Sequence, residues 1–344
     1  MSIRSYKAKG QGSNPWFGIF FGSLFTIFII GGIFCGYLFY SSVREVVAHA
    51  GLQTFVNVPI FRPRESDLPV PDWSQKERVN ILLLGVDQRP QEVGPCRTDT
   101  MILVTVDPAT NTAGMLSIPR DLYVEVPGYG LNRINVAHFI GDRDNYPGGG
   151  PALAKKTVQY NLGVPIHYYI RINFQGFRDI IDALGGITVE VEREIWDDKY
   201  PDENYGYTTI YIPAGVQQMD GETALRYART RHNGSDFVRL RRQQKVLFAI
   251  REKALSLDLI PRLPDLLRTM GYTVDTDLDP QEVLALAQIA RQIEKEDIRS
   301  AVIDETMAVS VILPDTGANV LYPLRDKIAE VVEEIFSSPA EGEE

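Results

Sequence analysis

The sequence predicts an α/β fold, an αβα sandwich with a mixed central β-sheet, preceded by one transmembrane helix. Three apolar runs of strand length lie close together at the start of the domain, and strand patterns alternate with amphipathic helical patterns after them. A stretch of 25 uncharged residues comes before all of these elements. Mixed strands and helices indicate α/β architecture, and an uncharged stretch of this length indicates a membrane span.

The uncharged stretch, Trp16–Tyr40, would be about 38 Å long as a helix, and the hydrocarbon of a bilayer is about 30 Å thick. Arg4, Lys7 and Lys9 precede it, so the positive-inside rule places residues 1–15 in the cytoplasm. A cleaved signal peptide is the alternative, but the stretch is longer than a usual signal core and no small-residue cleavage site follows it cleanly. We therefore expect a single-pass membrane protein with an extracytoplasmic domain.

The composition of the whole chain is that of a folded globular protein. The chain of 344 residues is 44% hydrophobic and 23% charged, with a formal net charge of −10. Prolines mark 41–78 as an extended linker, the domain is expected over 79–336, and 337–344 form a tail. Cys96 is the one cysteine after the span, so the core must stabilise the domain without an internal disulfide. Catalysis by Cys96 would need an activating histidine, which the sequence does not single out.

Three strands are expected at the start of the domain, at 79–86, 100–106 and 113–118. A tight DPATNT turn joins the second to the third, which predicts a hairpin. If the first pair is antiparallel too, the end of the first strand, the start of the second and the end of the third share one sheet edge. Five charged residues fall at this edge: Asp87, Arg97, Asp99, Arg120 and Asp121.

Later patterns continue the mixed architecture. We expect a strand at 167–173, a helix at 174–186 closed by glycine, and a strand at 187–191. Asp220 and Asp236 are placed to cap two helices, which extend to about residues 227 and 255. The last expected elements are helices at 264–270, 280–293 and 323–336 and a strand at 298–303.

Five arginines are clustered in this acidic chain: Arg229, Arg231, Arg239, Arg241 and Arg242. The planar guanidinium fork fits phosphate oxygens, so the cluster predicts a polyanionic ligand such as a pyrophosphate. Arg239 and Gln243 share one face of their helix, whereas helix geometry points at least one of Arg241 and Arg242 away from it. The alternative is a solvated basic helix face.

Asp87 and Asp99 form a site of hard oxygen ligands at the shared edge. Mg²⁺, or Mn²⁺ in its place, suits one or two carboxylates together with phosphate oxygens. The alternative is that both aspartates form structural ion pairs with Arg97 and Arg120. Because a metal and guanidinium groups together neutralise a pyrophosphate as a P–O bond breaks, the arginine cluster favours the metal site.

Several motifs occur in the characteristic order of a known family: LLLGVD (82–87), RTDT (97–100), SIPRD (117–121), NRIN (132–135), DALGGI and ALRYARTRHNGSDFVRLRRQQ. By this set the chain resembles the LytR-CpsA-Psr proteins from about Val79 to Phe336. The resemblance includes the single N-terminal span, and no single motif is as specific as the set.

The resemblance implies a membrane-anchored phosphotransferase that moves a glycopolymer from a polyprenyl pyrophosphate carrier to a sugar hydroxyl of peptidoglycan or another cell-wall acceptor. By motif position, Asp87 and Asp99 would bind Mg²⁺. Arg97 would contact the pyrophosphate or orient these aspartates, and Asp121 would orient Arg120 or act as a base. A structural role for Asp121 is favoured, because PRD at a strand end also suits a turn. The implied pyrophosphate-binding set is Arg120, Arg229, Arg231, Arg239 and Gln243.

The family also implies a hydrophobic tunnel for the lipid tail, lined by the stretch 139–177 and the helix from Phe237, although these residues would be ordinary core in any α/β domain. The segment 196–211 is interpreted as a substrate-contacting loop or a surface excursion. Two other functions use the same residues, a polyprenyl pyrophosphate hydrolase and a sensor that binds the lipid carrier. Nucleic-acid binding is disfavoured, because the domain is acidic and expected outside the cell.

Overall fold

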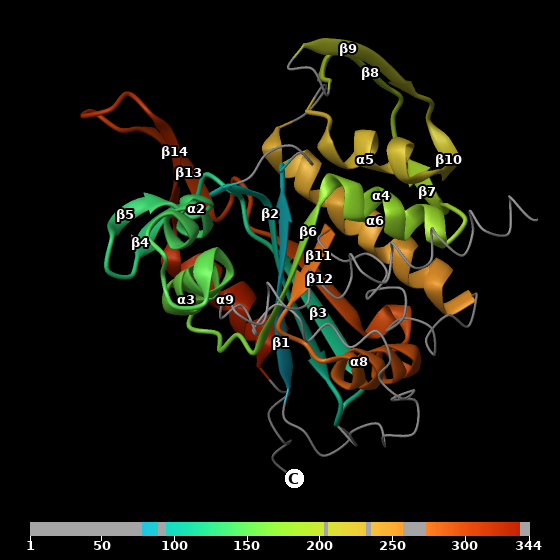
Figure 1. Cartoon of the computed structure of the whole chain (residues 1–344), viewed down its shortest axis with the longest axis horizontal. Coiled ribbons are helices and arrows are strands. Elements are labelled where there is room, and N and C mark those ends of the chain that lie inside the picture. The colour runs from blue at the N-terminus through green and yellow to red at the C-terminus, as the bar shows by residue number, and fades with distance from the viewer. Residues whose placement is uncertain (1–77, 89–93, 203–205, 232–234, 257–272, 338–344) are drawn as a thin grey trace, which may run out of the picture. The chain divides into compact units, whose positions relative to one another are not determined.

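The computed structural model describes residues 78–88, 94–202, 206–231, 235–256 and 273–337, which belong to one compact unit (Figure 1). The expected membrane span and cytoplasmic segment lie outside the described residues, as do the helix expected at 264–270 and nearly all of the linker and tail. Within the described ranges, no helix combines the length and apolarity that crossing a bilayer requires.

A six-stranded mixed sheet forms the centre of the domain, in the order β11-β6-β1-β2-β3-β12 (Figure 1). β2 pairs antiparallel with β3, as the DPATNT turn predicts, and β1 pairs antiparallel with β2, which meets the condition for a shared sheet edge. β6 and β12 run parallel to β1 and β3, while β11 runs antiparallel to β6. The strands are β1 (Val79–Val86), β2 (Thr98–Asp107), β3 (Thr112–Ser117), β6 (Tyr168–Asn173), β11 (Val274–Thr276) and β12 (Ile298–Val302).

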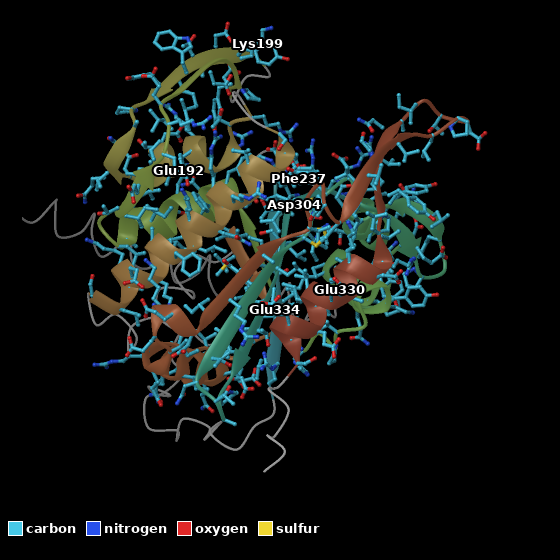
Figure 2. All side chains as sticks on the ribbon, turned by 180° about the vertical axis from the view of Figure 1, so that it is seen from behind. Glu192, Lys199, Phe237, Asp304, Glu330 and Glu334 are labelled. Carbon is cyan, nitrogen blue, oxygen red and sulfur yellow. The ribbon has the colours of Figure 1, made fainter. Side chains whose placement is uncertain are left out.

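Helices cover both faces of this sheet, which confirms the predicted sandwich. Leu82 and Leu84 pack on one face with α3 and α9, and Ile81 packs on the other face with α8. Because both faces are buried, β1 is a continuous apolar run instead of an alternating one. Glu330 and Glu334 lie on the outer, exposed side of α9 (Figure 2). The three helices are α3 (Gly149–Leu162), α8 (Pro280–Gln292) and α9 (Arg325–Phe336).

A second group of helices, α4, α5 and α6, packs around a separate apolar core with the two-stranded β7–β10 ribbon. The Asn173 side chain accepts a hydrogen bond from the backbone N–H of Gly176 and starts α4. The Asp220 side chain accepts a hydrogen bond from the backbone N–H of Thr223 and starts α5, as the sequence predicts. These elements are α4 (Phe174–Ala183), α5 (Gly221–Arg229), α6 (Asp236–Ser256), β7 (Ile187–Val191) and β10 (Gly215–Met219).

The structure refines the predicted elements at three places. α6 begins at Asp236 itself, and the carboxylate of that residue engages an arginine of the same helix. The strand at 187–191 is confirmed as β7 but pairs with β10 and not with the central sheet. The last helix begins at Arg325, because Asn319–Pro323 forms a strand, β14.

Several short elements are not predicted from the sequence patterns. β4–β5, β8–β9 and β13–β14 are two-stranded ribbons. The two helical elements are the eight-residue α2 and a single turn, η4. The bounds are α2 (Val136–Arg143), β4 (Tyr123–Val126), β5 (Gly130–Arg133), β8 (Ile195–Pro201), β9 (Tyr207–Ile212), η4 (Lys295–Asp297), β13 (Ala308–Ile312) and β14 (Asn319–Pro323).

Gln244 joins α6 to the central sheet. Its side-chain nitrogen donates to the Ser117 hydroxyl at 2.9 Å and to the Ala301 carbonyl at 2.7 Å. Gln244 and Ser117 are both buried, so neither polar group can exchange its partner for bulk water. This contact fixes α6 over the ends of β3 and β12.

Gln244→Ala is expected to lower the free energy of unfolding of residues 69–344 by about 1–3 kcal/mol, because buried acceptors and a hydroxyl lose their partner. Chemical denaturation measures the effect. Gln288→Ala, on the exposed side of α8, is the matched control and should change stability by less than about 0.5 kcal/mol. Equal stability of the two variants would contradict the proposed anchoring.

Candidate active site

A cavity of about 660 Å³ lies between the ends of the central strands, α4 and α6. Most of its wall is apolar, and one region is charged. The apolar wall includes Leu83, Ile102, Ile170, Ile172, Phe174, Phe177, Ile180, Val246, Leu247 and Ile250. We call the charged region the cavity mouth; it is formed by Asp87, Asp99, Arg229, Arg231 and Arg239.

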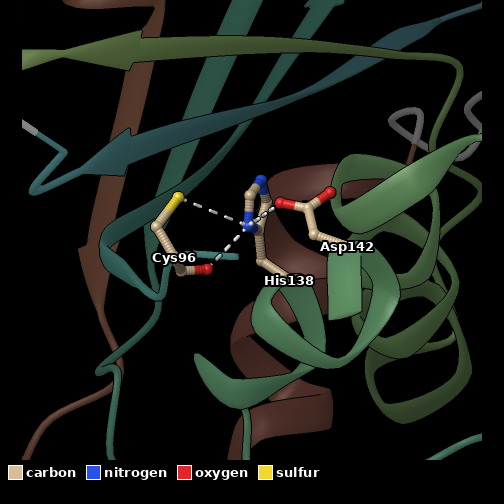
Figure 3. Close-up of side chains that lie close together, drawn as sticks. All are labelled: Cys96, His138 and Asp142. Atoms are coloured by element: carbon tan, nitrogen blue, oxygen red, sulfur yellow. Dashed lines mark hydrogen bonds and ion pairs between the residues drawn. The ribbon is translucent and has the colours of Figure 1, made fainter. Parts of the chain in front are cut away.

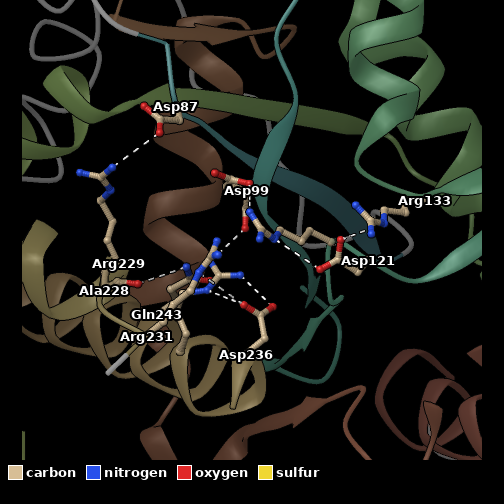
Figure 4. Close-up of polar contacts among 11 residues, drawn as sticks. Asp87, Asp99, Asp121, Arg133, Ala228, Arg229, Arg231, Asp236 and Gln243 are labelled. Carbon is tan, nitrogen blue, oxygen red and sulfur yellow. Dashed lines mark hydrogen bonds and ion pairs between the residues drawn. The ribbon is translucent and has the colours of Figure 1, made fainter. Parts of the chain in front are cut away.

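Strand pairing brings the two acids of the mouth together. Asp87 directly follows β1, and Asp99 is the second residue of β2, its antiparallel neighbour. Arg120 follows β3 at the same edge and donates from Nη1 to Asp99 Oδ1 at 2.6 Å. Arg229, at the end of α5, places Nη2 3.5 Å from Asp87 Oδ2 (Figure 4). The predicted convergence at one sheet edge is confirmed for these residues.

Aromatic rings hold Arg229 in place. Its guanidinium carbon lies 3.9 Å from the ring centroid of Phe174 and 5.3 Å from that of Tyr200. Its Nη1 also donates to the Tyr200 hydroxyl at 3.2 Å. Burial raises the pKa of Tyr200, although the Arg229 charge acts in the opposite direction, so the phenol stays neutral around pH 7. The arginine is thus oriented over the mouth while its charge faces the acids.

Arg239 links α6 to the sheet edge. Its side chain is only 3% exposed and forms a two-bond fork with Asp236, at 3.0 and 2.9 Å. Its Nη1 donates to the backbone carbonyl of Asp99 at 3.0 Å. Burial would raise the pKa of Asp236, but hydrogen bonds and charge from Arg239 hold it below its usual value.

Arg231 is the most accessible arginine of the mouth, with 52% of its side chain exposed. Its Nε lies 3.9 Å from Asp236 Oδ1. Loss of solvation together with repulsion from Arg120 and Arg239 lowers its pKa. Three guanidinium groups therefore share one small region, and an incoming anion would relieve their mutual repulsion.

Gln243 lies one helical turn after Arg239 and contributes to the same wall. Its side-chain nitrogen donates to the Ala228 carbonyl at 3.4 Å (Figure 4). Within the described part of the chain its buried Oε1 has no hydrogen-bond partner. This oxygen is free to accept a hydrogen bond from a polar ligand in the cavity.

Arg120, although it pairs with Asp99, does not line the cavity, and neither do the remaining predicted site residues, Arg97 and Asp121. Arg97 is exposed, and its guanidinium carbon lies 6.0 Å from the ring centroid of Phe139. Asp121 lies between two arginines, 3.6 Å from Arg120 Nε and 3.3 Å from Arg133 Nε (Figure 4). This contact pattern supports the structural role for Asp121.

Arg241 and Arg242 point away from the mouth, as helix geometry predicts for at least one of them. Arg241 pairs with Asp304 at 2.6 Å. Arg242 donates to the backbone carbonyl of Thr230 at 3.0 Å, and its guanidinium carbon lies 5.8 Å from the Tyr227 ring centroid. Neither residue lines the cavity.

The segment 196–211 lies partly at the cavity and partly at the surface, and contact with a substrate stays a prediction. It forms most of the β8–β9 hairpin, and Asp197, Lys199 and Pro201 line the cavity. Trp196 is 56% exposed on the outer face of the hairpin. Buried Asp197 accepts a hydrogen bond from the Thr230 hydroxyl at 2.6 Å, which ties the hairpin to the end of α5.

Sequence reasoning missed Phe174, Tyr200 and Asp236 as supports of the arginines. Phe174 and Asp236 begin helices, so their patterns indicate only helix starts. Tyr200 lies between two exposed residues of β8, so its pattern identifies an inward side chain. The pattern does not indicate that Arg229 is its partner. The predicted tunnel walls match in part: the cavity is lined from α6 and from the end of the stretch 139–177.

Residues 56–335 match the LytR_cpsA_psr family. The chain belongs to this family. Among its relatives, the polyisoprenyl-teichoic acid--peptidoglycan teichoic acid transferase TagU of Oceanobacillus iheyensis is 37% identical over 265 residues, which cover 76% of each chain. The enzyme of the same name from Bacillus cereus is 34% identical over 261 residues, 75% of this chain and 77% of its own.

Solved structures of the LytR_cpsA_psr family share the fold. The crystal structure of Bacillus subtilis TagV matches with a TM-score of 0.63 and 29% identity, covering 77% of this chain and 99% of TagV. A structure of TagT bound to LI-WTA matches with a TM-score of 0.60 and 29% identity, covering 79% of this chain and 94% of TagT. The mixed α/β domain is therefore the domain of this family.

Asp236→Asn is expected to lower the free energy of unfolding of residues 69–344 at neutral pH by about 1–3 kcal/mol, because a charged hydrogen-bonded pair is lost. The pKa of Asp236 is depressed in the folded state, so its contribution is full above the ordinary value of 3.8 and is lost as the pH falls through the folded pKa. Denaturation at several pH values should show wild type and variant converging in acid. Asp198→Asn, an exposed acid of β8, is the control. A difference in free energy of unfolding between wild type and variant that stays constant into acid would contradict a depressed pKa for Asp236.

Proposed function

We propose that the protein is a phosphotransferase that moves a glycopolymer phosphate from a polyprenyl pyrophosphate carrier to a sugar hydroxyl of peptidoglycan. The observation that carries this proposal is the cavity, which joins a long apolar wall to a mouth of arginines and aspartates. A polyprenyl pyrophosphate has the same division, an apolar chain attached to a compact polyanion. The teichoic acid transferases among the relatives support the same substrate class.

The two regions of the cavity have separate tasks. The apolar wall from α4 and α6 binds the prenyl chain by burying its hydrocarbon, at about 25 cal/mol per Å² removed from water. Arg229, Arg231 and Arg239 bind the pyrophosphate by charge-assisted hydrogen bonds, and Gln243 adds an amide contact. Arg120 reaches the same phosphates from the Asp99 side, oriented by Asp121. Arg97, exposed and two residues before Asp99, adds positive charge to this part of the surface.

The mouth suits a divalent cation. Two carboxylates, Asp87 and Asp99, line one cavity, and carboxylates with phosphate oxygens are the ligand set that Mg²⁺ or Mn²⁺ accepts. The arginines are already partly neutralised by Asp87, Asp99 and Asp236, so a polyanion there needs further positive charge. Bound by Asp87 and Asp99, Mg²⁺ would offset the negative charge that builds up on the phosphates during transfer.

The reaction conserves phosphate and releases the carrier. The acceptor hydroxyl oxygen forms a bond to the phosphorus that carries the glycopolymer, and the P–O bond to the second phosphorus breaks. Polyprenyl phosphate leaves with the bond electrons, and the hydroxyl proton is released. Positioning and charge neutralisation by the arginines supply most of the rate, so a strong base is not required. A membrane anchor at residues 16–40 with an extracytoplasmic domain would confine the enzyme to the surface that holds its lipid-linked donor.

Arg229→Ala is expected to reduce transfer by about 10²–10³-fold, because one donor to the transferring phosphates is lost. The assay combines the protein, a polyprenyl pyrophosphate oligosaccharide, peptidoglycan fragments and Mg²⁺, and follows the phosphodiester adduct by mass spectrometry. Arg241→Ala is the matched control, because Arg241 pairs with Asp304 away from the cavity and its loss should change the rate by less than about twofold.

The products separate the candidate functions. A phosphodiester adduct that Arg229→Ala loses establishes transfer. Sugar phosphate released without an adduct, even with acceptor present, would favour the hydrolase. Tight donor binding with no turnover in the wild type would favour the sensor, and full transfer by Arg229→Ala would contradict the assigned pyrophosphate site.

Chelation is expected to stop transfer, and Mg²⁺ is expected to restore it. Asp87→Asn should raise the Mg²⁺ concentration needed for half-maximal rate by at least about tenfold, because a ligand loses its charge. Asp198→Asn, which removes a carboxylate outside the cavity lining, should leave that concentration unchanged. Transfer that continues at an undiminished rate after chelation would show that the two aspartates act only as ion-pair partners.

A further inference from the structure

Two side chains of α2, His138 and Asp142, meet Cys96 from the segment before β2, outside the cavity lining (Figure 3). Their donor atoms are a nitrogen, an oxygen and a sulfur. Cys96 Sγ lies 3.9 Å from His138 Nδ1, and Asp142 Oδ2 lies 3.4 Å from the same nitrogen. All three donor atoms lie within 4.8 Å of one another. Among the described residues, they form the one group of three or more such donors close enough to share an ion.

We propose that Cys96, His138 and Asp142 form a binding site for a divalent transition metal ion of the zinc class. A sulfur, an imidazole nitrogen and a carboxylate oxygen are the ligand types that Zn²⁺ and Co²⁺ prefer, whereas Mg²⁺ prefers oxygen alone. Tetrahedral bonds of about 2.3 Å to sulfur and about 2.0 Å to nitrogen or oxygen separate these donors by roughly 3.3–3.6 Å. The observed 3.9 and 3.4 Å lie close to these separations, and the distance between the sulfur and the carboxylate oxygen, within 4.8 Å, shortens as the side chains close on the ion.

The local structure already orients the ligands. His138 and Asp142 are spaced i, i+4 and share one face of α2. The second carboxylate oxygen of Asp142, Oδ1, accepts from the backbone N–H of Gly150 at 2.6 Å, so Oδ2 is left toward the histidine. A carboxylate anchored through its other oxygen is the outer-shell arrangement that stabilises metal sites.

The histidine changes partner when the ion binds. Its side chain is fully buried, and Nδ1 donates to the Cys96 carbonyl at 2.8 Å, which keeps the ring aimed at Cys96. On binding, the ion would replace the hydrogen on Nδ1, and that hydrogen would move to Nε2 of the same ring. The Cys96 thiol would bind as a thiolate and release its proton. Cys96 and Asp142 are partly exposed, which gives the ion a path in and leaves a coordination position for water.

This site is independent of the proposed function. Cys96 comes three residues before Asp99, so an ion held here would fasten the segment that leads into β2 to α2. It would act on stability and on the position of that segment, while Asp87 and Asp99 serve the phosphate. Loss of the metal site leaves the Mg²⁺ requirement of transfer in place.

Cobalt is the probe, because a thiolate–cobalt bond absorbs in the near ultraviolet and its visible bands report tetrahedral geometry. The full chain in detergent is titrated with Co²⁺, with Cys35→Ala as the background so that only Cys96 can supply sulfur. We expect one equivalent of Co²⁺ with a thiolate band, displaced by Zn²⁺. Cys96→Ser should remove the band, and His138→Gln and Asp142→Asn should each weaken Co²⁺ binding by at least about tenfold.

Asp198→Asn, which removes an exposed carboxylate of β8 that belongs to neither site, is the matched control and should leave the cobalt spectrum unchanged. Circular dichroism of each variant checks folding, and Asp142→Asn keeps an oxygen for the Gly150 contact. The absence of a thiolate band in the folded protein would overturn the proposal. A band that survives Cys96→Ser, or one that His138→Gln and Asp142→Asn leave at full affinity, would overturn it as well.

Discussion

Asp99 joins the sheet to the helical layer, and the arrangement of the mouth depends on it. Its carboxylate accepts from Arg120, which follows β3, and its backbone carbonyl accepts from Arg239 of α6. Arg239 is in turn held by Asp236 at the start of the same helix. Residues from three distant parts of the chain therefore have fixed positions relative to one acid. Arg239 is almost fully buried, so water cannot replace its partners. Loss of either partner would leave a buried, uncompensated charge, which is strongly destabilising.

The cavity combines two chemical environments, and each has its own structural cause. The apolar wall is built where α4 and α6 face the ends of the parallel strands β1 and β6, and side chains of all four elements line it. The charged mouth exists because antiparallel pairing of β1, β2 and β3 collects three strand termini at one edge. Arg229 belongs to both environments, since its guanidinium packs on Phe174 while it faces Asp87. An amphipathic, pyrophosphate-bearing lipid matches this division.

Much of the fold was predictable from the sequence, because buried strands such as 79–86 are long apolar runs and caps such as Asp220 are local signals. The convergence of Asp87, Asp99 and Arg120 was also predictable, since it follows from hairpin connections alone. Contacts between residues that are distant in the sequence were not predictable. Nothing near Arg229 indicates Phe174, and nothing near Cys96 indicates His138, because those contacts depend on how helices pack on the sheet. The β8–β9 ribbon gives no clear period, because a register shift between Asp197 and Tyr200 interrupts the alternation of β8.

The central claim is that the cavity holds the lipid chain while the mouth holds the pyrophosphate. The most direct measurement uses a polyprenyl pyrophosphate with a photoreactive group on its apolar chain, followed by mass spectrometry of the cross-linked peptides. The account predicts cross-links to the cavity wall, in particular to Phe177 of α4 and Ile250 of α6, and competition by the unlabelled lipid. Cross-links confined to exposed apolar residues elsewhere, such as Val309 and Ile312 of the β13–β14 ribbon, would contradict it.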